Sequence, residues 1–364
     1  MRLRERLPLL WQEPSQVRIG TDPRWSSTLA DLSPGAVRAL TGVAAGATVR
    51  TVRAALRREG ATQAEADDVV AHLKAAHLLV DAPTPDTPDA HVLGLLEPDG
   101  SPTEALARRS AATVHIHGLG RLGATAAGLL ATAGVGRLAL VDRSPVDRHD
   151  VGWAGLAPSD LGRPRADAVA HVLQGRGTSL VTSKPARSAP APDAVLLVEH
   201  HVADPTRHRT LVADAVPHLS VVVREASVLV GPLVDPGATP CLRCLDLRRT
   251  DQDPHWPAIA AQLAVARPGP EESALAAVGG SLAAAQLLAW LDRGTSALAG
   301  AALEVALPDV VPRIISWPVH AECGCAGIPD VPVAGAAPVA GAVPVAGAEL
   351  RAPDVTPLGT PQGR

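Results

Sequence analysis

Apolar residues in the central part of the chain form short continuous runs that alternate with segments of helical periodicity. A run rich in Val and Leu is typical of a strand covered on both faces, and alternation with helices is typical of a parallel α/β sheet. We therefore expect an α/β domain over residues 111–326. Its expected strands are residues 112–117, 137–142, 194–199, 219–225, 302–307 and 313–319, and its expected helices are residues 121–133, 159–173, 205–216 and 272–292.

Residues 1–82 predict a separate small α+β domain. Extended segments divided by turn signals come first, and helices follow. Ser33, Thr48 and Thr62 each stand at an N-cap position, and Glu65 is expected to complete a capping box with Thr62. This order of strands and helices suggests a winged-helix-like module. Its expected strands are residues 7–12, 16–20 and 26–32.

Two segments of unusual composition flank the central domain. Residues 81–90 carry three prolines and no periodicity, so residues 83–110 are expected to form a linker and a lead-in helix. The pentapeptide PVAGA starts at Pro332, Pro338 and Pro344. Because this repeat holds few large apolar side chains, residues 327–364 are expected to be disordered.

The composition argues against nucleic acid as a partner of this protein. The chain has 33 Lys and Arg against 37 Asp and Glu, so it lacks the basic excess of a nucleic-acid-binding protein. It has no Phe and no Tyr, which excludes reading of nucleic acid by an aromatic platform and requires an aliphatic core. We find no signal peptide and no apolar run of about 18 residues, and expect a cytoplasmic protein that does not enter a membrane.

A glycine-rich turn joins the first expected strand of the central domain to its first helix. Gly118, Gly120 and Gly123 follow this strand, and Asp142 ends the next one. Glycines let backbone N–H groups approach a phosphate at a helix N-terminus, and an acid about 20 residues later binds ribose hydroxyls. The pattern predicts a nucleotide site. The alternative is that the glycines only let the helix pack closely on the strand.

The four cysteines fall in two close pairs. Cys241 pairs with Cys244, and Cys323 with Cys325. Four thiolates suit a tetrahedral structural Zn²⁺, which we expect here, whereas free thiols or a redox pair are the alternatives. His320 either replaces one cysteine ligand or is an ordinary residue at the end of a strand.

Further motifs resemble those of the ThiF/MoeB/HesA family, the bacterial relatives of ubiquitin-activating enzymes. The resemblance covers about residues 100–326, and it rests on the glycine loop, the AGVG element at 133–136, Val146, the DLG element at 160–162 and both cysteine pairs. It implies a Rossmann-like fold with a structural zinc and a homodimer. It also implies an adenylyltransferase that uses ATP and Mg²⁺ to activate the C-terminus of a peptide or sulfur carrier. The nucleotide would then be bound by Gly118, Gly120, Arg121, Gly123, Asp142 and Arg165, with Arg165 as the catalytic cation on the phosphates.

The sequence departs from the family pattern at the catalytic positions. Arg165 stands where the family has a phosphate-binding Lys, which keeps the charge but changes its geometry. His200 and His201 stand where the family has an Asp coupled to Mg²⁺, and imidazoles prefer softer metals. That carboxylate could be replaced by Asp193, Glu199 or Asp204. The family's other nucleotide-contacting residues are replaced by Ser144, Asp150, Trp153 and Ala154.

Two interpretations remain open for Arg121, and three further side chains could belong to the same site. Arg121 either places a guanidinium over the phosphates or is a solvated surface residue. His115 and His117 are either ligands at the carboxyl end of the sheet or ordinary strand residues. Trp153 is the tryptophan best placed for a role in a pocket.

The N-terminal module looks like the PqqD-like leader-peptide recognition domain of ribosomal peptide (RiPP) biosynthesis, on its order of elements alone. Such a module binds an extended peptide along a sheet edge. A plain accessory or dimerisation domain is the alternative. Fusion to a ThiF-like domain resembles the partner proteins of YcaO cyclodehydratases.

Two functional hypotheses follow from these resemblances. Either the chain is an adenylyltransferase, or it is a non-catalytic protein that presents a leader peptide to a YcaO-type modifying enzyme. A nicotinamide or flavin oxidoreductase fits the glycine loop alone.

Overall fold

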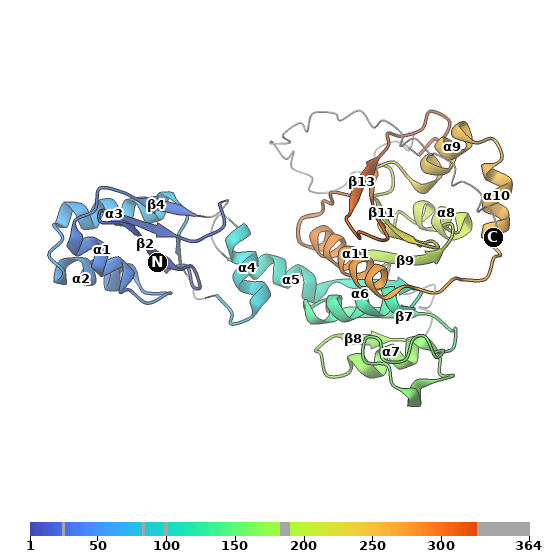
Figure 1. Ribbon diagram of the computed structural model, residues 1–364, viewed down its shortest axis with the longest axis horizontal. Coiled ribbons are helices and arrows are strands. Elements are labelled where there is room, and N and C mark those ends of the chain that lie inside the picture. The colour runs from blue at the N-terminus through green and yellow to red at the C-terminus, as the bar shows by residue number, and fades with distance from the viewer. Residues whose placement is uncertain (24–25, 82–83, 98–100, 183–189, 326–364) are drawn as a thin grey trace, which may run out of the picture. The chain divides into compact units, whose positions relative to one another are not determined.

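The computed structural model describes residues 1–23, 26–81, 84–97, 101–182 and 190–325 (Figure 1). The disorder expected for residues 327–364 falls outside these ranges.

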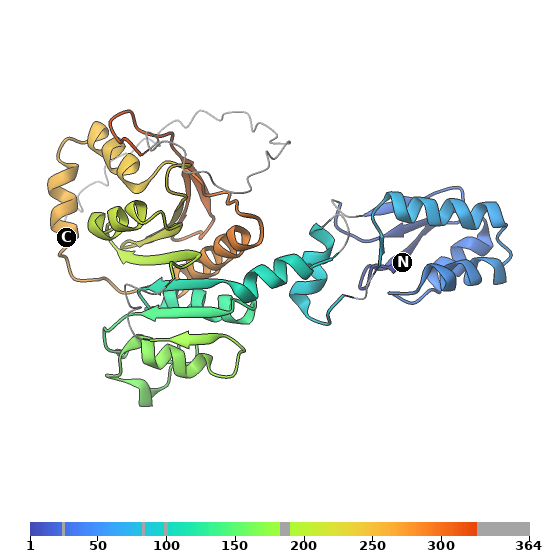
Figure 2. The ribbon, with the colours of Figure 1, turned by 180° about the vertical axis from the view of Figure 1, so that it is seen from behind.

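The central domain is built on one eight-stranded sheet. Its strands are β6 (Thr113–His117), β7 (Arg137–Val141), β8 (Ser179–Val181), β9 (Ala194–His200), β10 (His218–Val223), β11 (Ser227–Val234), β12 (Ala301–Ala306) and β13 (Arg313–Ser316). Their order across the sheet is β13-β12-β11-β10-β9-β6-β7-β8. The strands from β10 to β8 in this order pair in parallel, and β11, β12 and β13 continue the sheet antiparallel. Figure 2 shows the parallel strands from behind. The expected α/β domain with a mostly parallel sheet is confirmed.

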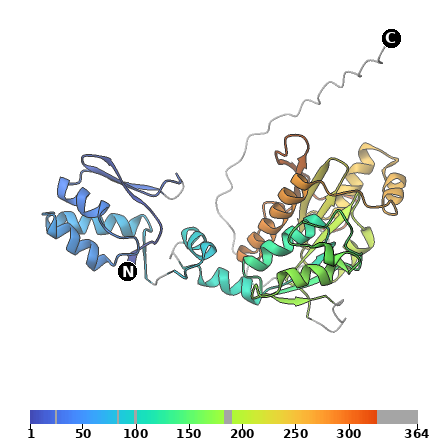
Figure 3. The ribbon, with the colours of Figure 1, turned by 60° about the horizontal axis from the view of Figure 1, so that its bottom comes forward.

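Helices cover both faces of this sheet. The helices of the central domain are α6 (Arg121–Thr132), α7 (Arg165–Leu173), α8 (Pro205–Ala213), α9 (Leu242–Gln252), α10 (Trp256–Leu263) and α11 (Ser273–Arg293). Of these, α10 contains no buried residue and contacts α9. Figures 1 and 3 show α6 and α11 side by side on one face and α8 on the other. Successive side chains of β9 face opposite sides of the sheet. Leu196 and Val198 belong to the core beneath α6 and α11, whereas the residues that precede them, Val195 and Leu197, pack with α8.

Helix α11 is long and apolar enough, by length and composition, to span a membrane. No apolar run of this length is expected from the sequence, so the structure differs from that expectation. The helix is part of the core, since Leu275, Ala283 and Leu287 are buried within the central cluster. A Cβ at Gly279 would stand 2.8 Å from Cδ1 of Leu122, so glycine there allows α6 to approach α11 closely.

The sequence did not predict β8, α9 or α10, and two predicted elements differ in the structure. The single helix expected over residues 159–173 is wrong, because a 3₁₀ turn (Pro158–Asp160) precedes α7 and the chain between them bends. Gly162 adopts φ +80° there, and Pro164 is the N-cap of α7. The strand expected over residues 219–225 is β10, which ends at Val223. The chain then turns directly into a second strand, β11, that pairs with β10 antiparallel.

The N-terminal residues form the three predicted strands and three predicted helices in order, and two short strands that were not predicted, β1 and β5, pair with each other. The elements are β1 (Arg2–Leu3), β2 (Leu9–Glu13), β3 (Gln16–Ile19), β4 (Ser27–Leu29), α1 (Pro34–Thr41), α2 (Val49–Arg58), α3 (Gln63–Ala75) and β5 (Leu79–Val80). Strands β2, β3 and β4 form an antiparallel sheet. Ser33, Thr48 and Thr62 are the N-caps predicted for the three helices. The capping box is wrong, because the carboxylate of Glu65 accepts the N–H and O–H of Ser33 instead, at 2.7 and 3.0 Å.

Two helices rather than one lie between the N-terminal module and β6. They are α4 (Pro88–Leu96) and α5 (Thr103–Ala111). The buried guanidinium of Arg109 on α5 bonds both carboxylate oxygens of Asp292 on α11 at 2.7 Å. It also donates to Asp89 on α4 at 2.8 Å. Arg109 therefore ties both connecting helices to the central domain.

Candidate functional site

The glycine loop joins β6 to α6 at the carboxyl end of the parallel strands. Gly118 adopts φ +85°, and a Cβ there would stand 2.3 Å from the carbonyl oxygen of Val198 on β9. A Cβ at Gly123 would stand 2.0 Å from the carbonyl oxygen of Gly118. Close backbone packing therefore requires both glycines, whatever else they do. Gly120 is the N-cap of α6 and offers no side chain to the first N–H groups of the helix.

Asp142 follows β7 and braces the same loop. Its Oδ2 accepts the backbone N–H of Leu119 at 2.8 Å, and its Oδ1 accepts the backbone N–H of Ser144 at 2.9 Å. These bonds connect the glycine loop to the loop that follows β7. The contact of Asp142 with a ribose stays a prediction.

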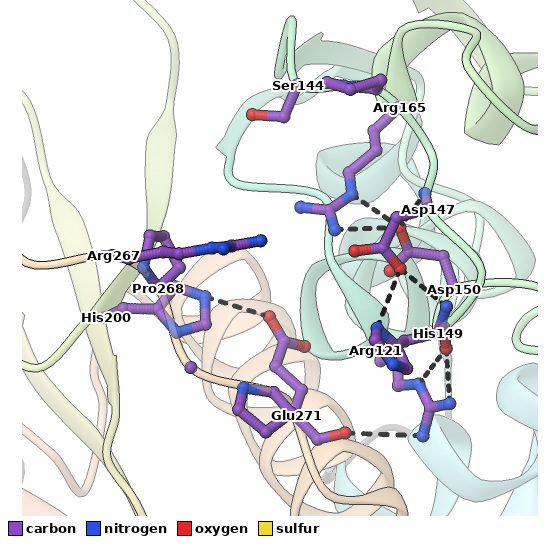
Figure 4. A pocket seen from close by; sticks show the side chains of 13 residues that line it. Arg121, Ser144, Asp147, His149, Asp150, Arg165, His200, Arg267, Pro268 and Glu271 are labelled. Atoms are coloured by element: carbon purple, nitrogen blue, oxygen red, sulfur yellow. Dashed lines mark hydrogen bonds and ion pairs between the residues drawn. The ribbon is translucent and has the colours of Figure 1, made fainter.

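Arg165 lies on the wall of a cavity of about 680 Å³ beside the glycine loop. Its Nε and Nη2 lie 2.9 and 2.8 Å from Oδ2 of Asp150, a side chain only 6% exposed. Burial acts to lower the pKa of Arg165, but the carboxylates of Asp150 and Asp142 outweigh it and raise that pKa. The position expected to carry the phosphate-binding cation therefore does carry a fixed positive charge (Figure 4).

Arg121 also lines the cavity, but its donors have partners within the protein. Its Nε and Nη2 donate to the carbonyl oxygen of His149, and its Nη1 donates to Oγ of Ser273 at 3.0 Å. Its guanidinium lies 5.3 Å from the ring centre of Trp153. The indole N–H of Trp153 in turn donates to the carbonyl oxygen of Arg121 at 2.9 Å. Trp153 thus fixes the start of α6 and does not line the cavity.

The opposite wall of the cavity is the segment 267–271, Arg-Pro-Gly-Pro-Glu, between α10 and α11. Figure 4 shows the side chain of Arg267 extending across the cavity toward Arg165. Over the described ranges, no ion pair of the Arg267 guanidinium is recorded. The sequence analysis did not single out this segment. Its only local signal is a charged, proline-rich loop between two helices.

Glu271 ends this segment and reaches the start of α6. Its Oε2 accepts the backbone N–H of Leu122 at 2.6 Å, and its Oε1 lies 3.3 Å from Nε2 of His200. Its side chain is 8% exposed. A Cβ at Gly120 would stand 2.2 Å from Oε1 of Glu271, so glycine at 120 leaves room for this carboxylate. Sequence reasoning missed Glu271 because it is 149 positions from its partner Leu122.

The two histidines after β9 fix the segment 267–271. His200 contacts Glu271, and Nε2 of His201 lies 3.1 Å from the carbonyl oxygen of Arg267. The Nδ1 atom of His200 is buried and has no hydrogen-bond partner within the part of the chain that the structure describes. His200 lines the cavity, whereas His201 is not among its lining residues and acts on the segment through the carbonyl oxygen of Arg267.

None of the three carboxylates considered as substitutes for that Asp lines the cavity. Asp193 accepts the N–H of Thr113 at 2.7 Å, before β9 begins. Glu199 is 2.9 Å from Arg207, and Asp204 caps α8. His115 and His117 lie on β6 and are not among the residues that line the cavity either.

Asp147 is the acid of the cavity that is most accessible. Its side chain is 54% exposed, and its Oδ1 accepts the N–H of His149 at 2.6 Å. Burial acts to raise the pKa of Asp147, but this hydrogen bond and the nearby cations outweigh it and lower that pKa. Asp147 is therefore an anionic oxygen donor at neutral pH, suited to a hard cation such as Mg²⁺.

The four cysteines meet at one buried point beside α9. Their Sγ atoms all lie within 4.8 Å of one another, with 3.4 Å between Cys241 and Cys323 and 3.3 Å between Cys244 and Cys325. Zinc–sulfur bonds of about 2.3 Å in a tetrahedron place sulfur atoms about 3.8 Å apart, so this cluster fits Zn²⁺. His320 contacts Asp251 at 2.9 Å and is not part of the cluster. Among the described residues, the candidate metal ligands are the four cysteines.

Several solved structures share the fold of this chain. Escherichia coli MccB, solved with AMPCPP and MccA, matches with a TM-score of 0.66 at 14% identity, over 90% of this chain and 100% of that chain. The microcin C7 biosynthetic enzyme MccB in complex with N-formylated MccA matches with a TM-score of 0.64 at 14% identity, over 89% and 99%. PaaA matches with a TM-score of 0.65 at 17% identity, over 85% and 98%. At these identities the likeness shows the fold alone.

Sequence comparison places the chain in a family. No curated protein matches it in sequence. The model of the ThiF family, however, matches residues 98–323. That span contains the glycine loop, Arg165, the segment 267–271 and three of the four clustered cysteines. Because the match covers more than half of the chain, the protein belongs to the ThiF family.

Proposed function

We propose that the protein is an ATP-dependent adenylyltransferase that activates the C-terminal carboxylate of a peptide. The observation that carries this proposal is the cavity beside the glycine loop, where the cations Arg165 and Arg267 face the acids Asp147 and Asp150. Paired cations and an accessible carboxylate suit a nucleoside triphosphate with Mg²⁺. The likeness to MccB, which was solved with AMPCPP and MccA, supports a nucleotide and a second substrate.

In this reaction the peptide carboxylate attacks the α-phosphorus of ATP. The bond to the β-phosphate breaks, and the products are a peptidyl adenylate and pyrophosphate. Arg165 would stabilise the negative charge on the phosphates, held in place by Asp150. Asp147 would hold Mg²⁺, which neutralises phosphate charge when bound.

The N-terminal module would bind the peptide, as a PqqD-like leader-recognition domain does. Edge strand β4 and helix α3 border a groove that is lined by residues of both, among them Leu29, Val69 and His72. An extended peptide could pair with the free edge of β4 and place side chains in this groove. A winged-helix-like identity for this module is part of the same proposal.

A non-catalytic function is the second candidate. Here the protein would present a leader peptide to a modifying enzyme of the YcaO type. The specific observation in its favour is the carboxylate of Glu271 at the N-terminus of α6, together with His200 in place of the family's Asp. In this case the fold and the zinc centre would remain without adenylation. A homodimer in the cytoplasm is proposed for either function.

Pyrophosphate exchange distinguishes the two functions. The full chain would be incubated with ATP, Mg²⁺, labelled pyrophosphate and synthetic peptides encoded beside its gene. The first function predicts label in ATP with a peptide that has a free C-terminus and none with its C-terminal amide. Peptide binding without exchange would support the second function.

A further inference from the structure

The N-terminus of α6 is occupied by a carboxylate of the protein itself, that of Glu271. The first N–H groups of a helix have no partner within the helix, and a nucleotide phosphate commonly accepts them. Here the N–H of Leu122 donates to Oε2 of Glu271 at 2.6 Å. The same carboxylate lies over Gly120, close enough that a Cβ there would be 2.2 Å from it. Glu271 therefore occupies the position that the glycine loop offers to a phosphate.

Glu271 is held there by few contacts. Apart from Leu122, its carboxylate contacts Nε2 of His200 at 3.3 Å. The rest of the segment 267–271 is tied through two carbonyl oxygens, since His201 bonds that of Arg267 at 3.1 Å and Arg121 bonds that of Glu271 at 3.4 Å. Pro268 and Pro270 have no N–H to donate. The segment is thus attached mainly through the side chains of neighbouring residues. Its release breaks no hydrogen bond within a helix or strand.

A carboxylate and a phosphate cannot share this position, because both are anionic and need the same N–H donors. We propose that the segment 267–271 is a gate, in which Glu271 closes the nucleotide site and must leave before ATP binds. The inference rests on the proposed function, since it takes ATP as the ligand. It assigns to Glu271 the control of nucleotide affinity. It also links Arg267 to the gate, because a segment that withdraws Glu271 carries Arg267 with it.

Calorimetric titration of the full chain with ATP and Mg²⁺ tests the gate. Glu271→Gln removes the charge but keeps an oxygen that can accept the N–H of Leu122, and Glu271→Ala removes the occupant altogether. If the closed state holds about nine-tenths of the molecules, opening it lowers the apparent Kd about tenfold. We expect both variants to bind ATP more tightly, the alanine variant by about tenfold. A merely structural role for Glu271 predicts weaker binding instead.

The control is Glu104→Gln, which removes one charge from a side chain on α5 that is 88% exposed. It should leave the affinity for ATP unchanged. Equal affinity in wild type and both Glu271 variants would overturn the gate and leave the proposed function standing. Binding by none of the proteins at millimolar ATP would overturn both.

Backbone amide NMR relaxation provides a second readout that does not need the variants to fold. Tripolyphosphate added to the wild-type protein should lower the heteronuclear NOE of the Gly269 and Glu271 amides, because a released segment moves more. Unchanged or higher NOE values in this segment, with bound tripolyphosphate, would overturn the gate.

Discussion

Arg165 and Asp150 form a close ion pair on the cavity wall, with Nε and Nη2 of the arginine 2.9 and 2.8 Å from one carboxylate oxygen. Asp150 is almost fully buried, so Arg165 provides the countercharge that its carboxylate requires. Arg165 therefore has two functions. It is the cation available to a nucleotide, and it stabilises the loop that follows β7.

Removal of Arg165 should therefore affect both stability and activity. We expect Arg165→Ala to lower the free energy of unfolding by about 3 kcal/mol, since it leaves the buried carboxylate of Asp150 without its countercharge. Pyrophosphate exchange should fall by about a hundredfold or more, as when a charge that stabilises a transition state is lost. Urea unfolding and the exchange assay measure the two effects.

The double variant Arg165→Ala/Asp150→Ala separates these effects. It should recover most of the stability, because no unpaired charge remains, but none of the exchange. Recovery of exchange along with stability would show that Arg165 acts only through the fold.

Zinc should be bound by the four cysteines in a ratio of one per chain. Cys244→Ser should reduce the zinc content measured by elemental analysis and lower the thermal unfolding midpoint, because metal binding contributes to folding. The matched control is His320→Ala, which changes a residue close to the cluster that pairs with Asp251 and should leave the zinc content unchanged. Zinc well below one per chain in the wild type would contradict a four-thiolate centre.

Two glycines of the loop should respond differently to alanine. Gly120→Ala would place a Cβ against the Glu271 side chain, whereas Gly123→Ala would place one against the backbone oxygen of Gly118. Each should destabilise the protein by about 1–3 kcal/mol. Added Glu271→Ala should relieve the effect at Gly120 but not at Gly123, as urea unfolding would show. Equal costs in both backgrounds would contradict the placement of Glu271.

The alternating pattern of the sequence was enough to predict the parallel strands and the helices between them, because the buried residues of a strand such as β9 are contiguous. The cysteine cluster was predictable for a similar reason, since ligand spacing is a local property. Arg165 was placed by its position after the DLG element and does line the cavity.

Glu271 and Asp150 could not be assigned in the same way. Each acts through a partner on a different element, and no local pattern marks a carboxylate that reaches a helix 149 positions away. The prediction of one helix over residues 159–173 was wrong for a different reason. The positive φ of Gly162 and the Pro164 N-cap interrupt the chain despite the helical periodicity around them.

Acid should destabilise the protein through a buried histidine pair. Nδ1 of His208 lies 2.7 Å from Nε2 of His218, and burial lowers the pKa of His208 to about 3 and that of His218 to about 4. An unfolded histidine titrates near pH 6.5, so between these values the unfolded chain binds more protons. The stabilisation is complete above about pH 7 and is lost as pH falls from 6.5 toward 4, by up to about 1.4 kcal/mol per histidine and pH unit.

Urea unfolding at pH 7.5 and pH 5.5 measures this loss. His208→Gln should reduce the difference between the two values, whereas His255→Gln, at a side chain that is 86% exposed, should not. A free energy of unfolding that is equal at both pH values would contradict the buried neutral pair.

Transfer of oxygen from peptide to nucleotide tests the central claim most directly. A peptide that supports exchange would be labelled with ¹⁸O at both oxygens of its C-terminal carboxylate and incubated with the full chain, ATP and Mg²⁺. Hydroxylamine would then attack the carbonyl carbon of the adenylate and release AMP. If the carboxylate attacks the α-phosphorus, mass spectrometry will find one ¹⁸O atom in each AMP. Unlabelled AMP, or ADP and phosphate in its place, would contradict adenylation of the peptide.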